Sequence, residues 1–153
     1  MANTYTQIHI HSVFAVQHRM ALIQNGWEDE LFKYITGIIQ SYDHKVLAIN
    51  GMPDHVHIFF GMRPNQSLSD LMKEVKQSSS KWINDRRLLK TRFEWQQGYG
   101  AFSYNRSRVS NVITYIQNQK THHQRKSFID EYKGLLKEFS IEHDERYIFK
   151  ELE

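Results

Sequence analysis

The sequence contains no cysteine, only two prolines and no long apolar run. Without cysteine the chain can form no disulfide and no zinc–thiolate site, and it offers no cysteine nucleophile. No stretch approaches the roughly 18 apolar residues of a membrane-spanning helix, and no signal peptide is visible, so we expect a cytoplasmic protein without a membrane partner. With no proline-rich linker, residues 1–153 are expected to form one domain.

What the sequence does contain is enough apolar material for a core and an uneven distribution of charge. Hydrophobic residues make up 40% of the chain and aromatic residues 13%, which argues against a wholly disordered protein. The net charge is only +3, yet residues 63–126 hold 13 Lys/Arg and 4 Asp/Glu. A basic middle between mildly acidic ends predicts a surface that faces a polyanion, although a solvated charged face would have the same composition.

The spacing of apolar residues predicts alternating strands and helices. The predicted strands cover residues 5–16, 45–50 and 55–61 and the end of 95–104, and the predicted helices cover 26–42, 68–85, 107–124 and about 128–138. Ser67 is the expected N-cap of the second helix. The order β-α-β-β-α-β-α is that of the ferredoxin-like split βαβ arrangement, so we expect an α+β, RRM-like fold with an antiparallel sheet and a further C-terminal helix. Many functions share this fold, so it decides none.

A pair of histidines is the first candidate for chemistry. His55 and His57 lie two residues apart on a predicted strand, so both imidazoles point to one face while Val56 points to the other. Two adjacent imidazoles can bind one divalent ion and leave positions open for another ligand and for phosphate oxygens. Two half-exposed strand histidines without a metal would give the same short pattern.

A tyrosine and a glutamine form the second candidate. Tyr115 and Gln119 are four residues apart on a predicted helix and share a face. A phenol is a weak nucleophile at its usual pKa, and it becomes effective when a metal polarises the phosphorus that it attacks. The glutamine carbonyl could serve as an oxygen ligand of magnesium or manganese. An ordinary solvent-edge tyrosine and glutamine would also fit this pattern.

The third candidate is the basic middle of the chain, which could bind nucleic acid through phosphate contacts. Its predicted DNA-binding residues are Lys73, Lys76, Lys81, Arg86, Arg87, Lys90 and Arg92. Trp82, Phe93 and Trp95 lie among them, and aromatic faces can stack on unpaired bases. Both tryptophans could instead belong to the core, and Trp82 continues the apolar stripe of its helix. His122, His123, Arg125 and Lys126 could also approach phosphate.

Four segments together resemble a known family. They are Pro53-Asp54-His55-Val56-His57-Ile58, Ser78-Ser79-Ser80-Lys81-Trp82-Ile83, Trp95-Gln96-Gln97-Gly98-Tyr99-Gly100-Ala101-Phe102-Ser103 and Tyr115-Ile116-Gln117-Asn118-Gln119-Lys120-Thr121-His122-His123. In this order they resemble the HUH-type single-tyrosine transposases of bacterial insertion sequences, the TnpA-type, IS200-like transposases. The resemblance runs over nearly the whole chain.

The resemblance implies a role for each candidate residue. His55 and His57 would be metal ligands, Gln119 would complete a Mg²⁺ or Mn²⁺ site, and Tyr115 would be the nucleophile. It also implies a homodimer, with active sites built within one subunit or across two, that cleaves single-stranded DNA next to hairpins and rejoins it through a 5′-phosphotyrosine. Two alternatives stay open at this point, a non-catalytic single-stranded DNA- or RNA-binding module of the same fold and a domesticated hairpin-DNA nuclease.

Overall fold

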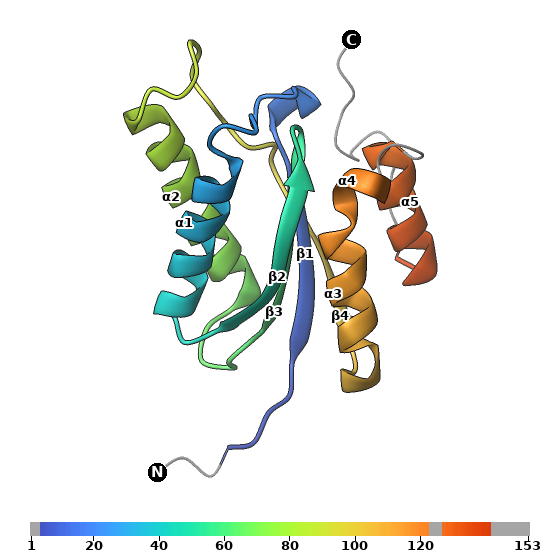
Figure 1. The fold of residues 1–153 in the computed structure, drawn as a ribbon. Coiled ribbons are helices and arrows are strands. Elements are labelled where there is room, and N and C mark those ends of the chain that lie inside the picture. The colour runs from blue at the N-terminus through green and yellow to red at the C-terminus, as the bar shows by residue number, and fades with distance from the viewer. Residues whose placement is uncertain (1–3, 123–126, 142–153) are drawn as a thin grey trace.

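The computed structural model describes residues 4–122 and 127–141 (Figure 1), and of His122 only the backbone. Of the phosphate-contact candidates near the end of the predicted tyrosine helix, His123, Arg125 and Lys126 lie outside the described residues. None of the helices within the described ranges is long and apolar enough to cross a membrane.

Four antiparallel strands form one sheet in the order β2-β3-β1-β4. They are β1 (His9–Ala15), β2 (Lys45–Met52), β3 (His55–Gly61) and β4 (Gly100–Tyr104). Their order is that of the split βαβ arrangement, which confirms the predicted α+β fold. The central strands β1 and β3 pair with Val13 opposite His57, so the histidine pair lies in the middle of the sheet.

Helices cover both faces of this sheet (Figure 1). One face carries α1 (Glu28–Ser41) and α2 (Leu68–Asp85), and the other carries α3 (Val109–Gln117), α4 (Gln119–His122) and α5 (Phe128–Glu138). Short 3-10 turns, η1 (Gln17–Arg19) and η2 (Arg106–Arg108), complete the element order. As predicted, α2 begins after Ser67, whose side chain accepts a hydrogen bond from the Asp70 amide at 3.1 Å.

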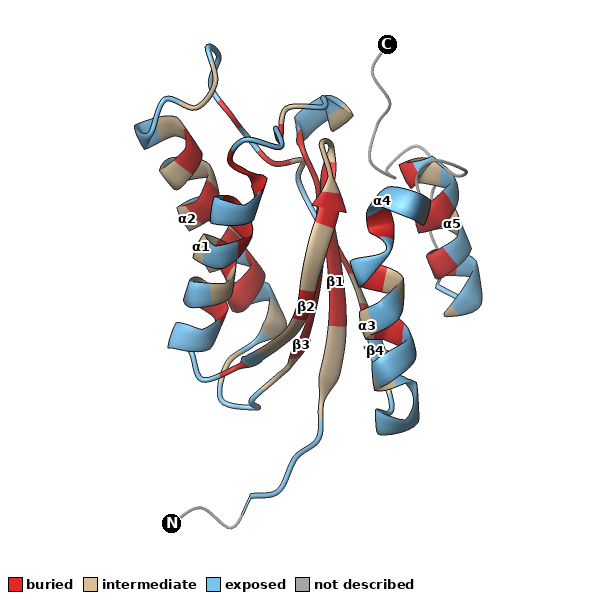
Figure 2. Ribbon diagram, in the orientation of Figure 1, coloured by how far each residue is buried: buried red, intermediate tan, exposed pale blue. Residues whose placement is uncertain are grey.

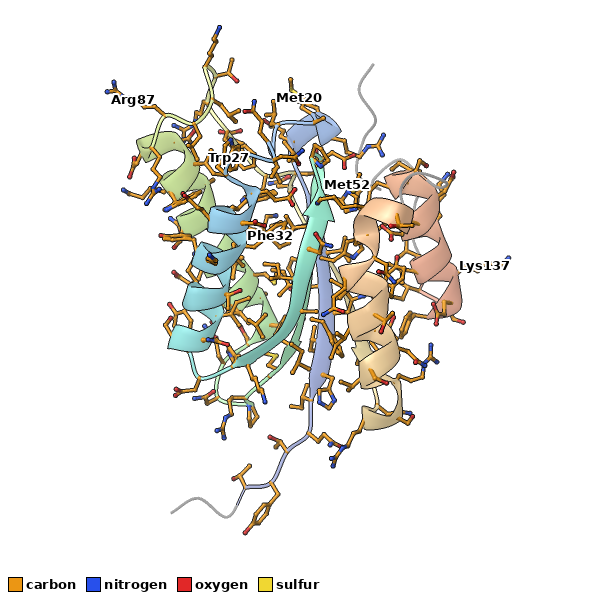
Figure 3. All side chains as sticks on the ribbon, in the orientation of Figure 1. Met20, Trp27, Phe32, Met52, Arg87 and Lys137 are labelled. Carbon is orange, nitrogen blue, oxygen red and sulfur yellow. The ribbon has the colours of Figure 1, made fainter. Side chains whose placement is uncertain are left out.

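The main core lies between the sheet and the helices α1 and α2. Val56, Ile58 and Phe60 of β3 point into it, as the alternation of the strand predicts. Figure 2 shows the buried stripes of α1 and α2 turned towards the sheet, and Figure 3 shows Phe32 of α1 among the side chains that fill this layer. The layer is almost wholly apolar, so it supplies stability rather than chemistry.

The opposite face of the sheet buries two smaller apolar clusters. Val13, Ala15 and Phe102 pack against α5, while Ala48 and Phe59 pack against α3. The polar residues of β1 and β3 lie between these clusters, under helices that come late in the sequence. The two clusters therefore fix α3 and α5 above a polar centre.

Two details differ from the sequence-based predictions, and the structure decides a third point that the sequence left open. The predicted helix 107–124 is divided at Asn118 into α3 and α4, and the first strand begins at residue 9 instead of 5. Phe93 and Trp95 are buried in the main core, where the Trp95 indole donates to Ser79 at 2.9 Å, so neither is exposed for stacking on bases. Trp82 lies at the edge of this core, stacked on Tyr34.

Candidate active site

The hairpin between β2 and β3 places the two histidines at the start of β3. Its turn holds only Pro53 and Asp54 between the strands. A β-carbon at Gly51 would lie 2.2 Å from the His55 carbonyl oxygen, so only glycine permits this close approach of the strands. His55 and His57 are both fully buried on the face that α3 and α5 cover.

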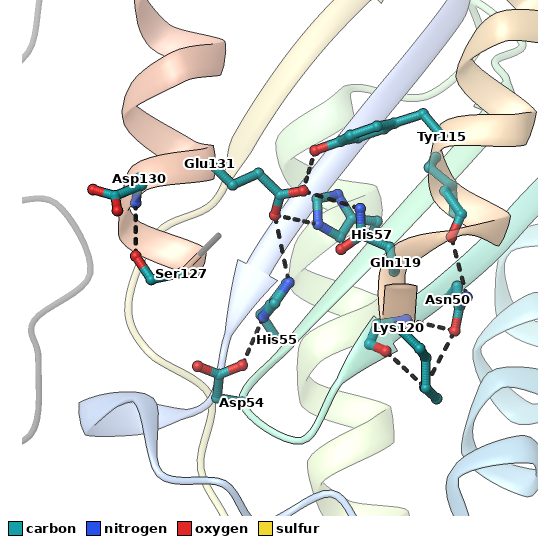
Figure 4. Close-up of polar contacts among 12 residues, drawn as sticks. Asn50, Asp54, His55, His57, Tyr115, Gln119, Lys120, Ser127, Asp130 and Glu131 are labelled. Atoms are coloured by element: carbon teal, nitrogen blue, oxygen red, sulfur yellow. Dashed lines mark hydrogen bonds and ion pairs between the residues drawn. The ribbon is translucent and has the colours of Figure 1, made fainter. Parts of the chain in front are cut away.

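One carboxylate contacts all four residues that the sequence predicts for the active site (Figure 4). Glu131, on α5, is 3% exposed, and its Oε1 lies 3.0 Å from His57 Nε2 and 3.6 Å from His55 Nε2. Its Oε2 accepts hydrogen bonds from the Tyr115 hydroxyl and, at 3.0 Å, from Gln119 Nε2. Glu131 thus joins the histidine pair of the sheet to the tyrosine segment.

In each histidine, the ring nitrogen that points away from Glu131 has a hydrogen-bond partner of its own. Asp54 Oδ1 lies 2.7 Å from His55 Nδ1, and His11 Nε2, on β1, lies 2.7 Å from His57 Nδ1. These contacts direct both Nε2 atoms towards the same point in front of the sheet. Such outer partners fix the ring orientation and tautomer of metal-binding histidines.

The surroundings shift the pKa of several groups in the site. Burial and the neighbouring imidazole of His57 hold the pKa of His11 well below its ordinary value, against a smaller opposing effect of Glu131. Burial alone would lower the pKa of His55, but hydrogen bonds to Asp54 and Glu131 outweigh it and raise that pKa. Burial and the negative charge of Glu131 raise the pKa of Tyr115 far above its ordinary value.

Polar contacts from the end of β2 hold the break between α3 and α4. Asn50 Nδ2 lies 3.1 Å from the carbonyl oxygens of Ile116 and Gln117, which the helix break leaves without their usual partners. Lys120 Nζ donates to the Gly51 carbonyl at 2.8 Å and to Glu28 of α1 at 2.7 Å. The segment that carries Tyr115 and Gln119 is therefore tied to the sheet of its own chain.

The donor atoms fit a divalent metal ion. One ligand atom each of His55, His57 and Glu131 lie within 4.8 Å of one another, and imidazole nitrogen with carboxylate oxygen is a set that manganese and related ions accept. Gln119 Oε1 is buried and has no hydrogen-bond partner among the described residues. A buried carbonyl oxygen without a partner is costly, and a metal ligand role would satisfy it.

A cleft of about 330 Å³ opens beside the tyrosine. Tyr104, Arg108 and Asn111 line one part of it, and Tyr115 and Glu131 line another. Its volume is at the lower end of the roughly 300–1,000 Å³ that small-ligand sites occupy. The cleft gives a substrate access to the phenol from solvent, while the histidines lie deeper.

The predicted DNA-binding residues lie away from this face, on α2 and the loop that follows it. Six of the seven are exposed, namely Lys73, Lys81, Arg86, Arg87, Lys90 and Arg92, and Figure 3 shows Arg87 extending outward at the end of α2. Lys76 differs, because its Nζ donates to the backbone carbonyls of Gln96 and Gly98 at 2.7 and 2.8 Å and is partly withdrawn from solvent.

The sequence reasoning did not identify Glu131, although it carried a signal. Glu131 falls on the buried stripe of α5, three residues after Phe128 and four before Leu135. A carboxylate on such a stripe indicates a partner or a function, because a buried charge must be compensated. His11 gives a similar signal on β1, where it shares a face with Val13.

Comparison with known proteins identifies relatives of this chain. A family model described as "Transposase IS200 like" matches residues 4–119. The ISDra2 transposase TnpA of Deinococcus radiodurans is 27% identical over 75 residues, which cover 49% of this chain and 54% of that protein. The chain thus spans about half the length of this curated relative.

Two solved structures share the fold. A transposase structure from Deinococcus radiodurans R1 matches with a TM-score of 0.64 and 21% identity, covering 78% of this chain and 95% of that one. A REP-associated tyrosine transposase bound to a REP hairpin matches with a TM-score of 0.60 and 15% identity, covering 80% of this chain and 73% of that one.

Proposed function

Because the chain belongs to the family of IS200-like transposases, we propose that it cleaves single-stranded DNA at the ends of an insertion sequence and rejoins it through a 5′-phosphotyrosine. The observation that carries this proposal is the convergence of four groups on Glu131. The two imidazoles of β3, the Tyr115 hydroxyl and the Gln119 amide meet at one buried carboxylate (Figure 4). A nucleophile and a set of metal donors within one small volume is what metal-assisted phosphoryl transfer needs.

His55 and His57 would hold a Mg²⁺ or Mn²⁺ ion through their Nε2 atoms, with Gln119 Oε1 as the third ligand that we favour and a Glu131 oxygen as the alternative. When bound, this ion supplies Lewis-acid polarisation of the scissile phosphate. Both histidines are held by outer hydrogen bonds, so the ligands are oriented before a metal binds.

The remaining chemistry belongs to the side chains of the chain itself. The scissile phosphate enters through the cleft beside Tyr115, whose hydroxyl proton passes to the carboxylate of Glu131 as the phenol oxygen forms a bond to phosphorus. The bond between phosphorus and the 3′ oxygen breaks, and that oxygen takes up a proton from water to become a 3′-hydroxyl. A 3′-hydroxyl of another strand end then attacks the phosphorus and loses its proton to water, while the tyrosine leaves and recovers its proton from Glu131.

We further propose that the substrate is a hairpin-bearing single strand and that the protein acts as a homodimer. The solved relative bound to a REP hairpin supports the first part, since it shares the fold. The exposed cations on α2 and the loop after it, 86–94, offer phosphate contacts at a distance from the nucleophile. A site that binds the hairpin there would leave the unpaired strand to reach Tyr115.

Adduct formation tests the proposal. The probe is a single strand that carries a hairpin from the DNA flanking the coding region, labelled at its 3′ end, because the fragment joined to tyrosine keeps that end. With Mn²⁺, wild-type protein should retain the label on a denaturing gel. Tyr115→Phe should abolish the adduct, while Tyr34→Phe, a matched change on α1, should keep it. An adduct in Tyr115→Phe would reject the assigned nucleophile.

The same assay separates the two catalytic functions, transposase and domesticated nuclease, from a non-catalytic binding module. A non-catalytic single-strand-binding module would shift the probe on a native gel and form no adduct with any divalent ion. A nuclease that has lost its element would form the adduct, but would not join the released 3′-hydroxyl to a second labelled end. Recovery of the joined product therefore distinguishes a transposase from a domesticated relative.

A further inference from the structure

We propose that His11 is a positioning residue of the metal site, which fixes the tautomer of His57 so that the Nε2 lone pair of His57 points at the metal. This inference rests on the metal site of the proposed function and assigns a role to a third histidine. His11 lies on β1, on the same face of the sheet as His57, and both side chains are fully buried. The two residues are diagonal neighbours across the β1–β3 pairing, because His11 is opposite Phe59 and Val13 is opposite His57.

The geometry of the contact leaves room for one hydrogen atom. His11 Nε2 and His57 Nδ1 are 2.7 Å apart, and the two rings are nearly parallel, with centroids 5.0 Å apart and 23° between their planes. At this distance one nitrogen donates and the other accepts. The proton on His57 Nδ1 and the lone pair on His57 Nε2 are therefore linked through the state of His11.

A neutral imidazole binds a metal through its unprotonated nitrogen. When Nε2 of His57 is the ligand, its hydrogen must be on Nδ1, and His11 Nε2 is the acceptor placed to receive it. Without such a partner, a buried Nδ1–H would be unsatisfied, at a cost of about 1–3 kcal/mol. His11 supplies the acceptor that this tautomer of His57 needs, and the hydrogen of His11 then lies on Nδ1, a buried atom without a hydrogen-bond partner among the described residues.

The two ligands of the pair are supported by partners of different kinds. Asp54 lies 2.7 Å from His55 Nδ1 and supplies a carboxylate, as is common for metal-binding histidines. His57 has an imidazole in the corresponding place. An imidazole can either accept or donate a hydrogen bond. His11 can therefore also donate to His57 Nδ1 when His57 Nε2 carries a hydrogen directed at Glu131, 3.0 Å away. The contact therefore suits the site with and without metal.

The substitutions that test this role keep or remove a partner at the same place. His11→Gln places an amide oxygen or nitrogen near the position of Nε2, and it can accept or donate. His11→Phe keeps a ring and removes both abilities. His9→Phe is the matched control, because His9 lies two residues earlier on the same face of β1 and its ring is near Phe59 instead of His57.

The first measurement is the affinity for Mn²⁺ in the absence of DNA, determined by electron paramagnetic resonance. Loss of an outer partner of a metal-binding histidine typically weakens affinity about 10–100-fold, and we expect this for His11→Phe. His11→Gln should recover most of the affinity, and His9→Phe should bind as the wild type does. Equal affinity in wild type and a folded His11→Phe, or no recovery in a folded His11→Gln, would reject the role.

The second measurement reads the tautomer directly and does not depend on a variant that folds. Long-range ¹H–¹⁵N spectra of ¹⁵N-labelled wild type with Mg²⁺ should show the His57 hydrogen on Nδ1. A hydrogen on Nε2 in the Mg²⁺-loaded protein would overturn the proposal. If wild type bound no divalent ion, the proposed metal site would fail, whereas normal binding and adduct formation in His11→Phe would remove only the role of His11.

Discussion

The face of the sheet under α1 and α2 and the face under α3 and α5 bury different kinds of side chain. Val56 and Ile58 enter a layer in which nearly every buried neighbour is apolar, while His57, between them on the opposite face, meets Glu131 and another histidine. Burying polar groups costs free energy unless each finds a partner. One face therefore accounts for the stability of the fold, and the other gives up part of that stability to hold reactive groups.

Adjacent residues of β3 allow this comparison to be tested one face at a time. The largest effect is expected for His57→Ala, which should reduce Mn²⁺-dependent adduct formation by about a thousandfold or more, equivalent to roughly 4 kcal/mol in the barrier. The physical reason is the loss of a metal ligand, so binding of the hairpin probe on a native gel should persist. A variant that cleaves DNA at near wild-type rates would contradict the assignment of His57.

Ile58, the next residue along β3, should show the opposite pattern, because its loss should lower stability and leave metal binding unchanged. Ile58→Ala removes buried volume from the apolar layer, where Ile58 is fully buried, and should lower the free energy of unfolding by about 2–5 kcal/mol. Urea denaturation followed by circular dichroism measures this loss. Below the unfolding transition the protein should still bind Mn²⁺ with wild-type affinity, and a marked loss of affinity in the folded variant would show that the two faces are not separable.

The different physics of the two faces also explains what the sequence could predict. The fold follows from local periodicity, because the alternation of β3 and the apolar spacing of α2 depend only on neighbouring residues. The alternation of side chains along a strand also predicts that His55 and His57 lie on the same face of β3. The contact between Tyr115 and the histidine pair could be expected only from the family resemblance, since it joins residues about 60 positions apart.

The partners of Glu131 and His11 could not be predicted from local periodicity. Their sequence positions show that each is on a buried face, yet the identity of the partner depends on how α5 docks and on which residues are diagonal across β1 and β3. The break at Asn118 is not predicted either, because Asn50, which donates to the carbonyl oxygens of Ile116 and Gln117 at the break, comes from a distant strand. Tertiary contacts of this kind leave no periodic signal in one sequence.

Alkaline pH should weaken the face under α3 and α5 selectively. Burial raises the pKa of Tyr132, on α5, to about 12, while a tyrosine in an unfolded chain ionises near 10. A raised folded-state pKa stabilises the native state below pH of about 10, and this contribution, of order 2 kcal/mol, is lost as the pH rises towards 12. Tyr104, on β4, has its pKa raised to about 12 by burial and by Glu138, and adds to the same effect.

Urea denaturation at several pH values measures this loss, and Tyr132→Phe is its control. The phenylalanine variant cannot ionise at this position, so its stability should fall less steeply between pH 10 and 12. Hydrogen exchange should show the amides of α5 losing protection before those of α1. Equal slopes for wild type and the variant would mean that Tyr132 ionises alike in the folded and unfolded chains.

The smallest effect is expected when two inactive variants are combined. Tyr115→Phe and His57→Ala carry their defects on different elements, so dimers with composite sites would regain one intact site per mixed dimer, or roughly a quarter of all sites in a random mixture. We expect no recovery. Asn50 and Lys120 tie the tyrosine segment to the sheet of its own chain, and Glu131 completes the site from the same chain.

Coexpression of the two variants with different tags, and purification through both, gives mixed dimers for the adduct assay. Inactivity of these dimers would agree with a site completed within one protomer, whereas an active mixed dimer would mean that the tyrosine segment crosses to the partner. If no doubly tagged species formed, the proposed homodimer would fail while the site within each chain would stand. Asn50→Ala in both variants sharpens the test, because it loosens the tie at the helix break and should permit exchange if that tie prevents it.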